Sequence, residues 1–219
     1  MTVGGWFDAE DPVGPLKVYR AIEKNDPETA NHIVMGPWSH GAWAWGEGDH
    51  LGDVQFNSNT SEYYRDKIEY PFFDYYLNGN GAADLPAAWV FETGTHRWRR
   101  FDAWPPKSAT PRSLYLQAGG KLSFDPPAED EAVDEYVSDP NRPVPFIDFI
   151  TRGMSQRYMV GDQRFASKRP DVLVYATEPL AEDLAIAGPI SPDLWVSTSG
   201  TDADFVVKLI DVYPADFPN

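Results

Sequence analysis

Short apolar runs alternate with an amphipathic segment near the start of the chain. Residues 2–6 and 32–36 have the length and apolar character of buried parallel strands. Between them, apolar side chains recur at three-residue steps from Val13 to Ile22, after Asp11 and Pro12, which are typical of a helix start. The order strand, helix, strand predicts a parallel α/β arrangement.

A longer helix is predicted over residues 59–77. Its apolar face holds Tyr64, Ile68, Phe72 and Tyr76. Pro71 should kink or restart this helix because proline lacks the N–H that a helix interior needs. Gly79 should close it.

A different pattern begins near residue 82. Short apolar runs are separated there by Pro, Gly and Asp clusters, with little helical periodicity. The runs span residues 88–91, 113–116, 172–175 and 205–210. We therefore expect an α/β region over residues 1–81 and an all-β region, a jelly-roll β-sandwich, over residues 82–219. The α/β region should be part of a larger domain, because so few strands make only one edge of a doubly wound sheet.

Charge and composition narrow the classes of partner. The chain has 219 residues, with 18 Lys and Arg against 34 Asp and Glu, so its net charge is −16. This charge repels phosphate backbones and anionic membranes and favours a small cationic ligand. The absence of cysteine excludes thiol nucleophiles, disulfides and cysteine-ligated metals. No apolar run reaches the roughly 20 residues of a membrane span, and the first residues lack the features of a signal peptide.

Two chemically suggestive side chains follow the two predicted parallel strands directly. Asp8 follows the first strand, and His40 follows the second, 32 residues later. Side chains at the carboxyl ends of adjacent parallel strands meet at one edge of the sheet, where α/β proteins place their chemistry. An Asp that holds a His forms two thirds of a Ser-His-acid triad, and a turn Asp beside an unrelated loop His is the alternative. No serine lies in a Gly-x-Ser-x-Gly motif, so the nucleophile is missing.

Acidic and aromatic residues surround this pair in sequence. Glu10 and Asp11 lie within three residues of Asp8, and such a cluster favours an ammonium or metal ligand. The structural alternatives are a helix cap for Asp11 and a solvated turn for Glu10. The loop after the second strand carries three tryptophans that could form a pocket wall or pack between domains. They are Trp38, Trp43 and Trp45.

Several segments together resemble a known family of serine hydrolases. These segments are Gly-Gly-Trp-Phe-Asp-Ala-Glu-Asp at residues 4–11, Met-Gly-Pro-Trp-Ser-His-Gly at 35–41, Pro-Phe-Phe-Asp at 71–74, and runs at 115–124, 136–140 and 206–214. They are similar to the α-amino acid ester hydrolases, within the wider cocaine-esterase-like and X-Pro dipeptidyl-peptidase-like enzymes. The resemblance implies the C-terminal edge of an α/β-hydrolase sheet followed by a jelly roll, of which residues 82–219 would be only a part.

The resemblance also implies roles for the candidate residues. Asp8 would be the triad acid and His40 the base, while Glu10 and Asp11 would hold the α-ammonium group of the substrate. The implied substrates are α-amino acid esters or β-lactam antibiotic amides with a free α-amino group, cleaved through an acyl-enzyme. No metal or organic cofactor is implied. A periplasmic or extracellular location follows from the resemblance alone.

Other interpretations remain open at this point. Without a serine nucleophile, the chain by itself is expected to be inactive. It could instead be a non-catalytic module that binds carbohydrate or a partner protein through exposed tryptophans. The candidates for such stacking are Trp89, Trp98, Trp104 and Trp195. It could also be an assembly piece that pairs with a second copy of itself or with the remainder of a parent enzyme.

Overall fold

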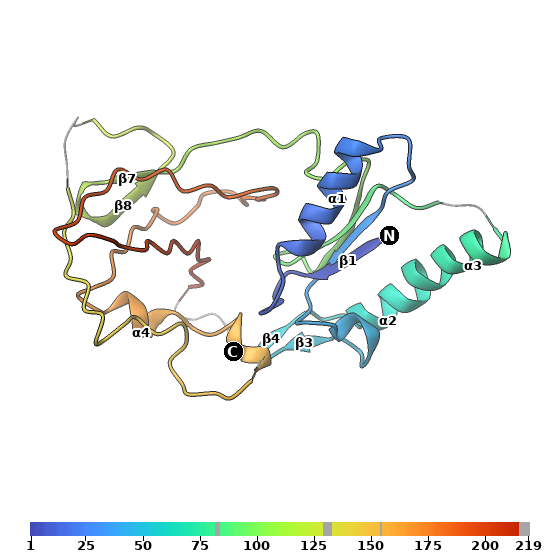
Figure 1. Cartoon of the computed structure of the whole chain (residues 1–219), viewed down its shortest axis with the longest axis horizontal. Coiled ribbons are helices and arrows are strands. Elements are labelled where there is room, and N and C mark those ends of the chain that lie inside the picture. The colour runs from blue at the N-terminus through green and yellow to red at the C-terminus, as the bar shows by residue number, and fades with distance from the viewer. Residues whose placement is uncertain (82–83, 129–132, 154, 215–219) are drawn as a thin grey trace.

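A four-stranded mixed sheet forms the centre of the first half of the chain (Figure 1). This computed structural model describes residues 1–81, 84–128, 133–153 and 155–214. The strand order is β1 (Thr2–Gly5), β2 (Ile33–Gly36), β5 (Ala88–Glu92) and β6 (Arg97–Phe101). The first three are parallel, and β6 is antiparallel to β5. All four residues of β2 are buried, which explains why this strand is apolar without alternation.

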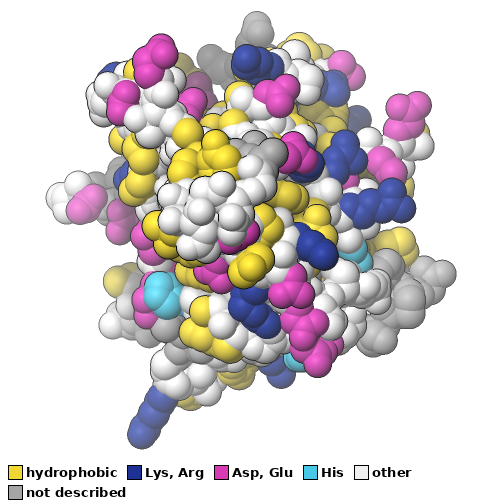
Figure 2. All heavy atoms as spheres, turned by 90° about the vertical axis from the view of Figure 1, so that its right-hand side faces the viewer, with side chains coloured by type: hydrophobic (Ala, Val, Ile, Leu, Met, Phe, Trp, Pro, Cys, Tyr) yellow, Lys and Arg dark blue, Asp and Glu magenta, His cyan; other side chains and the backbone are white. Residues whose placement is uncertain are grey.

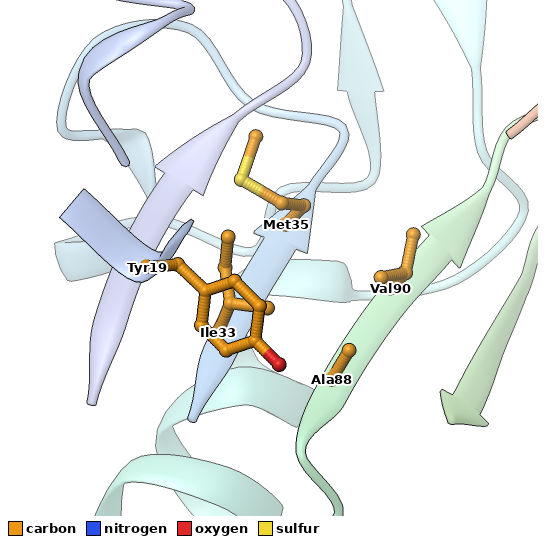
Figure 3. Close-up of a cluster of buried hydrophobic side chains, with 5 residues drawn as sticks. All are labelled: Tyr19, Ile33, Met35, Ala88 and Val90. Atoms are coloured by element: carbon orange, nitrogen blue, oxygen red, sulfur yellow. The ribbon is translucent and has the colours of Figure 1, made fainter. Parts of the chain in front are cut away.

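Helix α1 (Gly14–Asn25) covers one face of this sheet. Its residue Tyr19 packs on a cluster of buried side chains from β2 and β5 (Figure 3). Those side chains are Ile33, Met35, Ala88 and Val90. The sequence predicted a helix start at Pro12, but the helix begins at Gly14. Asp11 still caps this end, because its Oδ1 accepts the N–H of Gly14 at 2.7 Å.

A long helical segment covers the opposite face (Figure 1). It comprises α2 (Thr60–Tyr64), the π-helical turn η2 (Arg65–Glu69) and α3 (Tyr70–Asn78). The wide turn lies immediately before Pro71, where a regular helix would need the missing N–H. Gly79 ends the helix in the left-handed conformation, with φ of 70°. The predicted extent, the disruption at Pro71 and the glycine stop are confirmed.

One predicted strand belongs to a different sheet from the one expected. The run at 88–91 was assigned to the all-β region, but β5 hydrogen-bonds to β2 in parallel. That assignment is wrong, because pairing with a distant strand and not local sequence decides which sheet a strand joins. The sheet therefore crosses the predicted boundary at residues 81 and 82, and the division into two domains stays a prediction.

Small elements connect the larger ones. The turn η1 (Ala42–Ala44) follows β2, and β3 (His50–Leu51) pairs with β4 (Val54–Gln55) before α2 begins. None of the helices in the described residues combines the length and apolarity needed to cross a membrane.

The rest of the chain has little regular structure. A hairpin joins β7 (Tyr115–Gln117) and β8 (Lys121–Ser123) through η3 (Ala118–Gly120). Farther on lie only η4 (Gln156–Tyr158) and α4 (Arg164–Ser167) among residues 133–153 and 155–214. The runs at 172–175 and 205–210 form no strand, although Ala176 bridges to Lys121. The jelly roll therefore stays a prediction.

Candidate active site

The carboxyl ends of β1 and β2 lie side by side because the two strands pair in register. Gly5 is opposite Gly36 in this register, and the pairing continues beyond the strands through the N–H of Trp6 to Gly36 O at 2.8 Å. A Cβ on Gly5 would lie 2.1 Å from the carbonyl oxygen of Trp38. The absence of a side chain at Gly5 therefore lets the loop after β2 fold closely over the end of β1.

Asp8 and His40 meet at this edge of the sheet. The Nδ1 of His40 lies 2.9 Å from Oδ2 of Asp8 and 3.2 Å from its Oδ1. A carboxylate only accepts hydrogen bonds, so Nδ1 carries the proton and Nε2 is the nitrogen available to a substrate or nucleophile. The structure thus brings together the two residues that the strand positions predicted.

The Asp8 carboxylate is buried and fully engaged. Its exposed fraction is 3%, and its Oδ1 accepts the N–H groups of Glu10 at 2.8 Å and Asp11 at 3.0 Å. Burial by itself raises the pKa of Asp8, but these backbone hydrogen bonds and the His40 ring outweigh it and leave the pKa below its ordinary value. Asp8 is therefore a fixed negative charge at neutral pH.

His40 lies between two carboxylates. Its Nε2 is 3.2 Å from Oε2 of Glu10, and both of these side chains are half-exposed. The hydrogen bond that His40 donates to Asp8 and the charge of Asp8 raise the pKa of His40, with smaller contributions in the same direction from Glu10 and Asp11. The imidazole is thus held by Asp8 at Nδ1 and faces the half-exposed carboxylate of Glu10 at Nε2.

The three tryptophans after β2 occupy very different environments. Trp38 is 2% exposed, belongs to the core on the α2 face, and donates from Nε1 to Oγ1 of Thr60 at 2.9 Å. Trp43 is half-buried against Trp38, while Trp45 is 63% exposed. Only Trp43 and Trp45 are therefore open to a ligand, and a pocket-wall role stays a prediction.

Three side chains that the sequence did not indicate as functional hold this loop by hydrogen bonds. Thr60, Ser61 and Arg65 all donate hydrogen bonds to its backbone carbonyls. In the sequence these three residues are recognisable only as part of the first turns of a predicted helix. Such a prediction does not indicate which groups the helix will contact. Asp49 and His50 pair with each other at 2.7 Å, and no group of three possible metal ligands occurs among the residues described here.

Comparison with known protein families covers most of the chain. The X-Pro dipeptidyl-peptidase C-terminal non-catalytic domain matches residues 80–218. Cocaine esterase from Rhodococcus sp. (strain MB1 Bresler) is 30% identical over an alignment of 226 residues, which covers 98% of this chain and 38% of the esterase. The chain thus spans little more than a third of the length of that relative.

Two solved structures share the fold. An aminopeptidase from the marine sediment archaeon Thaumarchaeota archaeon superposes with a TM-score of 0.77 and 43% identity, over 82% of this chain and 30% of the other. An α-amino acid ester hydrolase gives a TM-score of 0.75 and 42% identity, over 84% of this chain and 32% of the other. From the extent of these matches, the chain belongs to the X-Pro dipeptidyl-peptidase C-terminal non-catalytic domain family, and it is similar over most of its length to cocaine esterase and to an α-amino acid ester hydrolase.

Proposed function

We propose that Asp8 and His40 are the acid and base of a Ser-His-Asp triad in a serine hydrolase. The hydrogen bond of 2.9 Å between them, at the carboxyl edge of parallel strands, is the observation that supports this proposal most directly. The acid precedes the histidine in the chain, as in α/β-hydrolases. In this proposal residues 1–81 belong to the edge of an α/β-hydrolase sheet and residues 82–219 to a jelly roll.

The proposed reaction follows from the different roles of the two ring nitrogens of His40. His40 Nε2 takes the proton of a serine hydroxyl as its oxygen attacks the acyl carbon, and then returns it to the leaving alcohol or amine. Water then cleaves the acyl-enzyme with the same base. Asp8 keeps the ring in the correct tautomer and stabilises its cationic form. No serine of this chain lies in a nucleophile-elbow motif, so the hydroxyl comes from elsewhere in the enzyme, and these 219 residues alone are inactive.

Glu10 supports an α-amino acid as the acyl group. Its carboxylate lies 3.2 Å from Nε2 of His40, the nitrogen that in this proposal faces the serine and the acyl carbon. In an α-amino acid ester the ammonium group is one carbon away from the acyl carbon, so it would reach Glu10 when the ester reaches His40. Asp11 adds negative charge nearby, although one of its oxygens is used by the N–H of Gly14. The proposed substrates are α-amino acid esters and β-lactam amides with an α-amino acyl side chain.

The test uses the complete enzyme, in which these residues are joined to the serine-bearing part. Asp8→Asn should reduce kcat/KM by on the order of 10⁴, because the ring then takes the wrong tautomer. Asp53→Asn removes an exposed carboxylate paired only with Arg157 and is the matched control. Phenylglycine methyl ester should be cleaved faster than methyl phenylacetate, which lacks the amino group. Activity of Asp8→Asn within about tenfold of the wild type would refute the triad assignment.

A binding module is the second candidate. The family matched over residues 80–218 is described as non-catalytic, and Trp195 is fully exposed. Of the other candidate tryptophans, Trp89 is 8% exposed, and Trp98 and Trp104 pack against the cores. Titration with oligosaccharides should give saturable tryptophan quenching, abolished by Trp195→Ala, if this part of the chain binds sugars. A hydrolase portion should give none.

A further inference from the structure

Two adjacent hydroxyl side chains lie beneath the loop that carries His40. Thr60 and Ser61 begin α2, and both are 0% exposed. A buried hydroxyl without a partner costs about 1–3 kcal/mol, so such residues are retained where their hydrogen bonds have a use. The contacts of these two side chains therefore indicate what they do.

Thr60 and Ser61 hold the loop on both sides of His40. Oγ1 of Thr60 accepts the indole N–H of Trp38 at 2.9 Å and donates to the carbonyl of Gly48 at 2.6 Å. Oγ of Ser61 donates to the carbonyl of Ala42 at 3.1 Å. His40 therefore lies midway between two attachment points of the loop, Trp38 and Ala42.

The backbone and one further side chain complete the attachment. The N–H of Ser61 donates to Glu47 O at 2.9 Å, and the guanidinium of Arg65 donates to the carbonyls of Trp43 at 3.2 Å and Gly46 at 2.7 Å. The fit is close, since a Cβ on Gly48 would lie 2.1 Å from Oγ of Ser61. Residues 60–65 at the start of this helical segment thus contact the loop at several points between Trp38 and Gly48.

The ring of His40 has little else to fix it. β2 ends at Gly36, the side chain of His40 is 48% exposed, and its ion-pair partners are the carboxylates of Asp8 and Glu10. The distance between His40 and Asp8 therefore depends on where the loop backbone is held. A misplacement of about 1 Å at a reacting group can reduce a rate by about 10²-fold.

We infer that Thr60 and Ser61 are positioning residues for His40: their buried hydroxyls fix the loop at Trp38 and Ala42 and so set the distance from the imidazole to Asp8. This inference rests on the proposed triad role of His40. Neither hydroxyl touches the substrate or the reacting atoms. Both act through the loop.

The experiment compares variants of the complete, serine-bearing enzyme. Thr60→Val keeps the shape of the side chain but removes its donor and acceptor, whereas Thr60→Ser keeps the hydroxyl. We expect Thr60→Val and Ser61→Ala to lower kcat by about 10²-fold with KM within about threefold, and Thr60→Ser to stay within about threefold of the wild type. Thr95→Val, which removes an exposed hydroxyl bonded to Glu92, is the matched control.

A second readout separates positioning from a general loss of stability. The proton on Nδ1 of His40 should give a downfield NMR resonance in the wild type, assigned by its absence in His40→Gln, and Thr60→Val should weaken or shift it while the protein stays folded. A folded Thr60→Val with unchanged kcat and resonance would overturn the inference. If Thr60→Val does not fold, Ser61→Ala decides by the same two measurements. Loss of activity in Asp8→Asn but in neither hydroxyl variant would refute only this inference, whereas an active Asp8→Asn would refute the triad itself.

Discussion

The Glu10 carboxylate is the residue that most directly controls the open side of His40. Its Oε2 is within 3.2 Å of Nε2, and its charge contributes to the raised pKa of the imidazole. A general base must be neutral to accept a proton, so a raised pKa moves the onset of activity to higher pH. An α-ammonium group that pairs with Glu10 would reduce this effect.

We predict that Glu10→Gln lowers the pKa of His40, because one of the nearby negative charges is removed. The change should be visible as an acid shift in the NMR titration of the His40 ring. In the complete enzyme the acid limb of kcat/KM should move to lower pH in the same direction. Glu28→Gln, an exposed residue between α1 and β2, should leave the titration unchanged. An unchanged His40 titration in Glu10→Gln would contradict the prediction.

The pair of Asp8 and His40 also makes the stability of the folded chain depend on pH. The pKa of Asp8 is lower in the folded chain than its ordinary value, so its contribution is present above the ordinary carboxyl pKa and is lost as pH falls through the folded value. The pKa of His40 is raised, so its contribution is present below the ordinary imidazole pKa and is lost as pH rises through the folded value. The pair therefore stabilises the fold most between these two titrations.

We predict that wild-type protein loses free energy of unfolding more steeply than Asp8→Asn as pH falls through the lowered pKa of Asp8. Urea denaturation at a series of acidic pH values measures the two slopes. Asp53→Asn should follow the wild-type slope, since its carboxylate is 85% exposed. Parallel curves for wild type and Asp8→Asn would show that this carboxylate is not linked to folding.

The meeting of Asp8 and His40 could be predicted from sequence because each follows a strand directly and parallel strands end at one edge. The contact of Glu10 with Nε2 could not, because it depends on the conformation of a turn. The partners of Thr60 and Ser61 could not either. These partners include carbonyls of a loop 12 to 19 residues earlier in the chain, and a helical period identifies the buried face of a helix but not the polar groups that this face will contact.

Among the elements, the helical segment from Thr60 to Asn78 shows how local signals and packing combine. Its extent, its interruption near Pro71 and its end at Gly79 could be predicted from local chemistry, namely the missing N–H of Pro71 and the left-handed conformation that Gly79 allows. The placement of β5 could not, because an apolar run of this length fits either sheet. Only pairing with β2, more than 50 residues earlier in the chain, decides it.

We predict that Gly79→Ala destabilises the protein by about 1–2 kcal/mol, the cost of a left-handed conformation for an L-residue. A Cβ at Gly79 would meet nothing within 4 Å, so conformational strain is the whole effect. Gly94→Ala is a matched control, because Gly94 also has open space around it but no positive φ. Chemical denaturation should place Gly94→Ala within about 0.5 kcal/mol of the wild type. Equal losses at both positions would contradict the explanation.

On the scale of the whole molecule, apolar side chains are distributed unevenly. The buried clusters belong almost entirely to the sheet and the helices on its two faces. Many other large apolar residues are exposed, and four of them form a stripe on α3, the helix at the end of the molecule that faces the viewer in Figure 2. The stripe consists of Tyr70, Phe73, Tyr76 and Leu77. Exposed apolar surface of this extent is typical of proteins that associate.

We predict that the chain associates with itself when its charge is screened. The net charge of −16 opposes association, so raising the salt concentration should increase the measured mass. Light scattering at low and high salt over a range of protein concentrations tests this directly. A mass of 24.6 kDa under all of these conditions would contradict it and favour pairing with the remainder of a parent enzyme instead.

The π-helical turn from Arg65 to Glu69 determines which side chains of α3 point in a given direction relative to the side chains of α2. Such a turn holds one residue more than a regular helix, and each residue rotates a helix by about 100°. Deleting a single residue there would leave Thr60 and Ser61 where they are but turn the stripe on α3 by more than a quarter of a revolution. The two ends of this helical segment are therefore free to evolve separately, one against the His40 loop and the other against whatever the stripe meets.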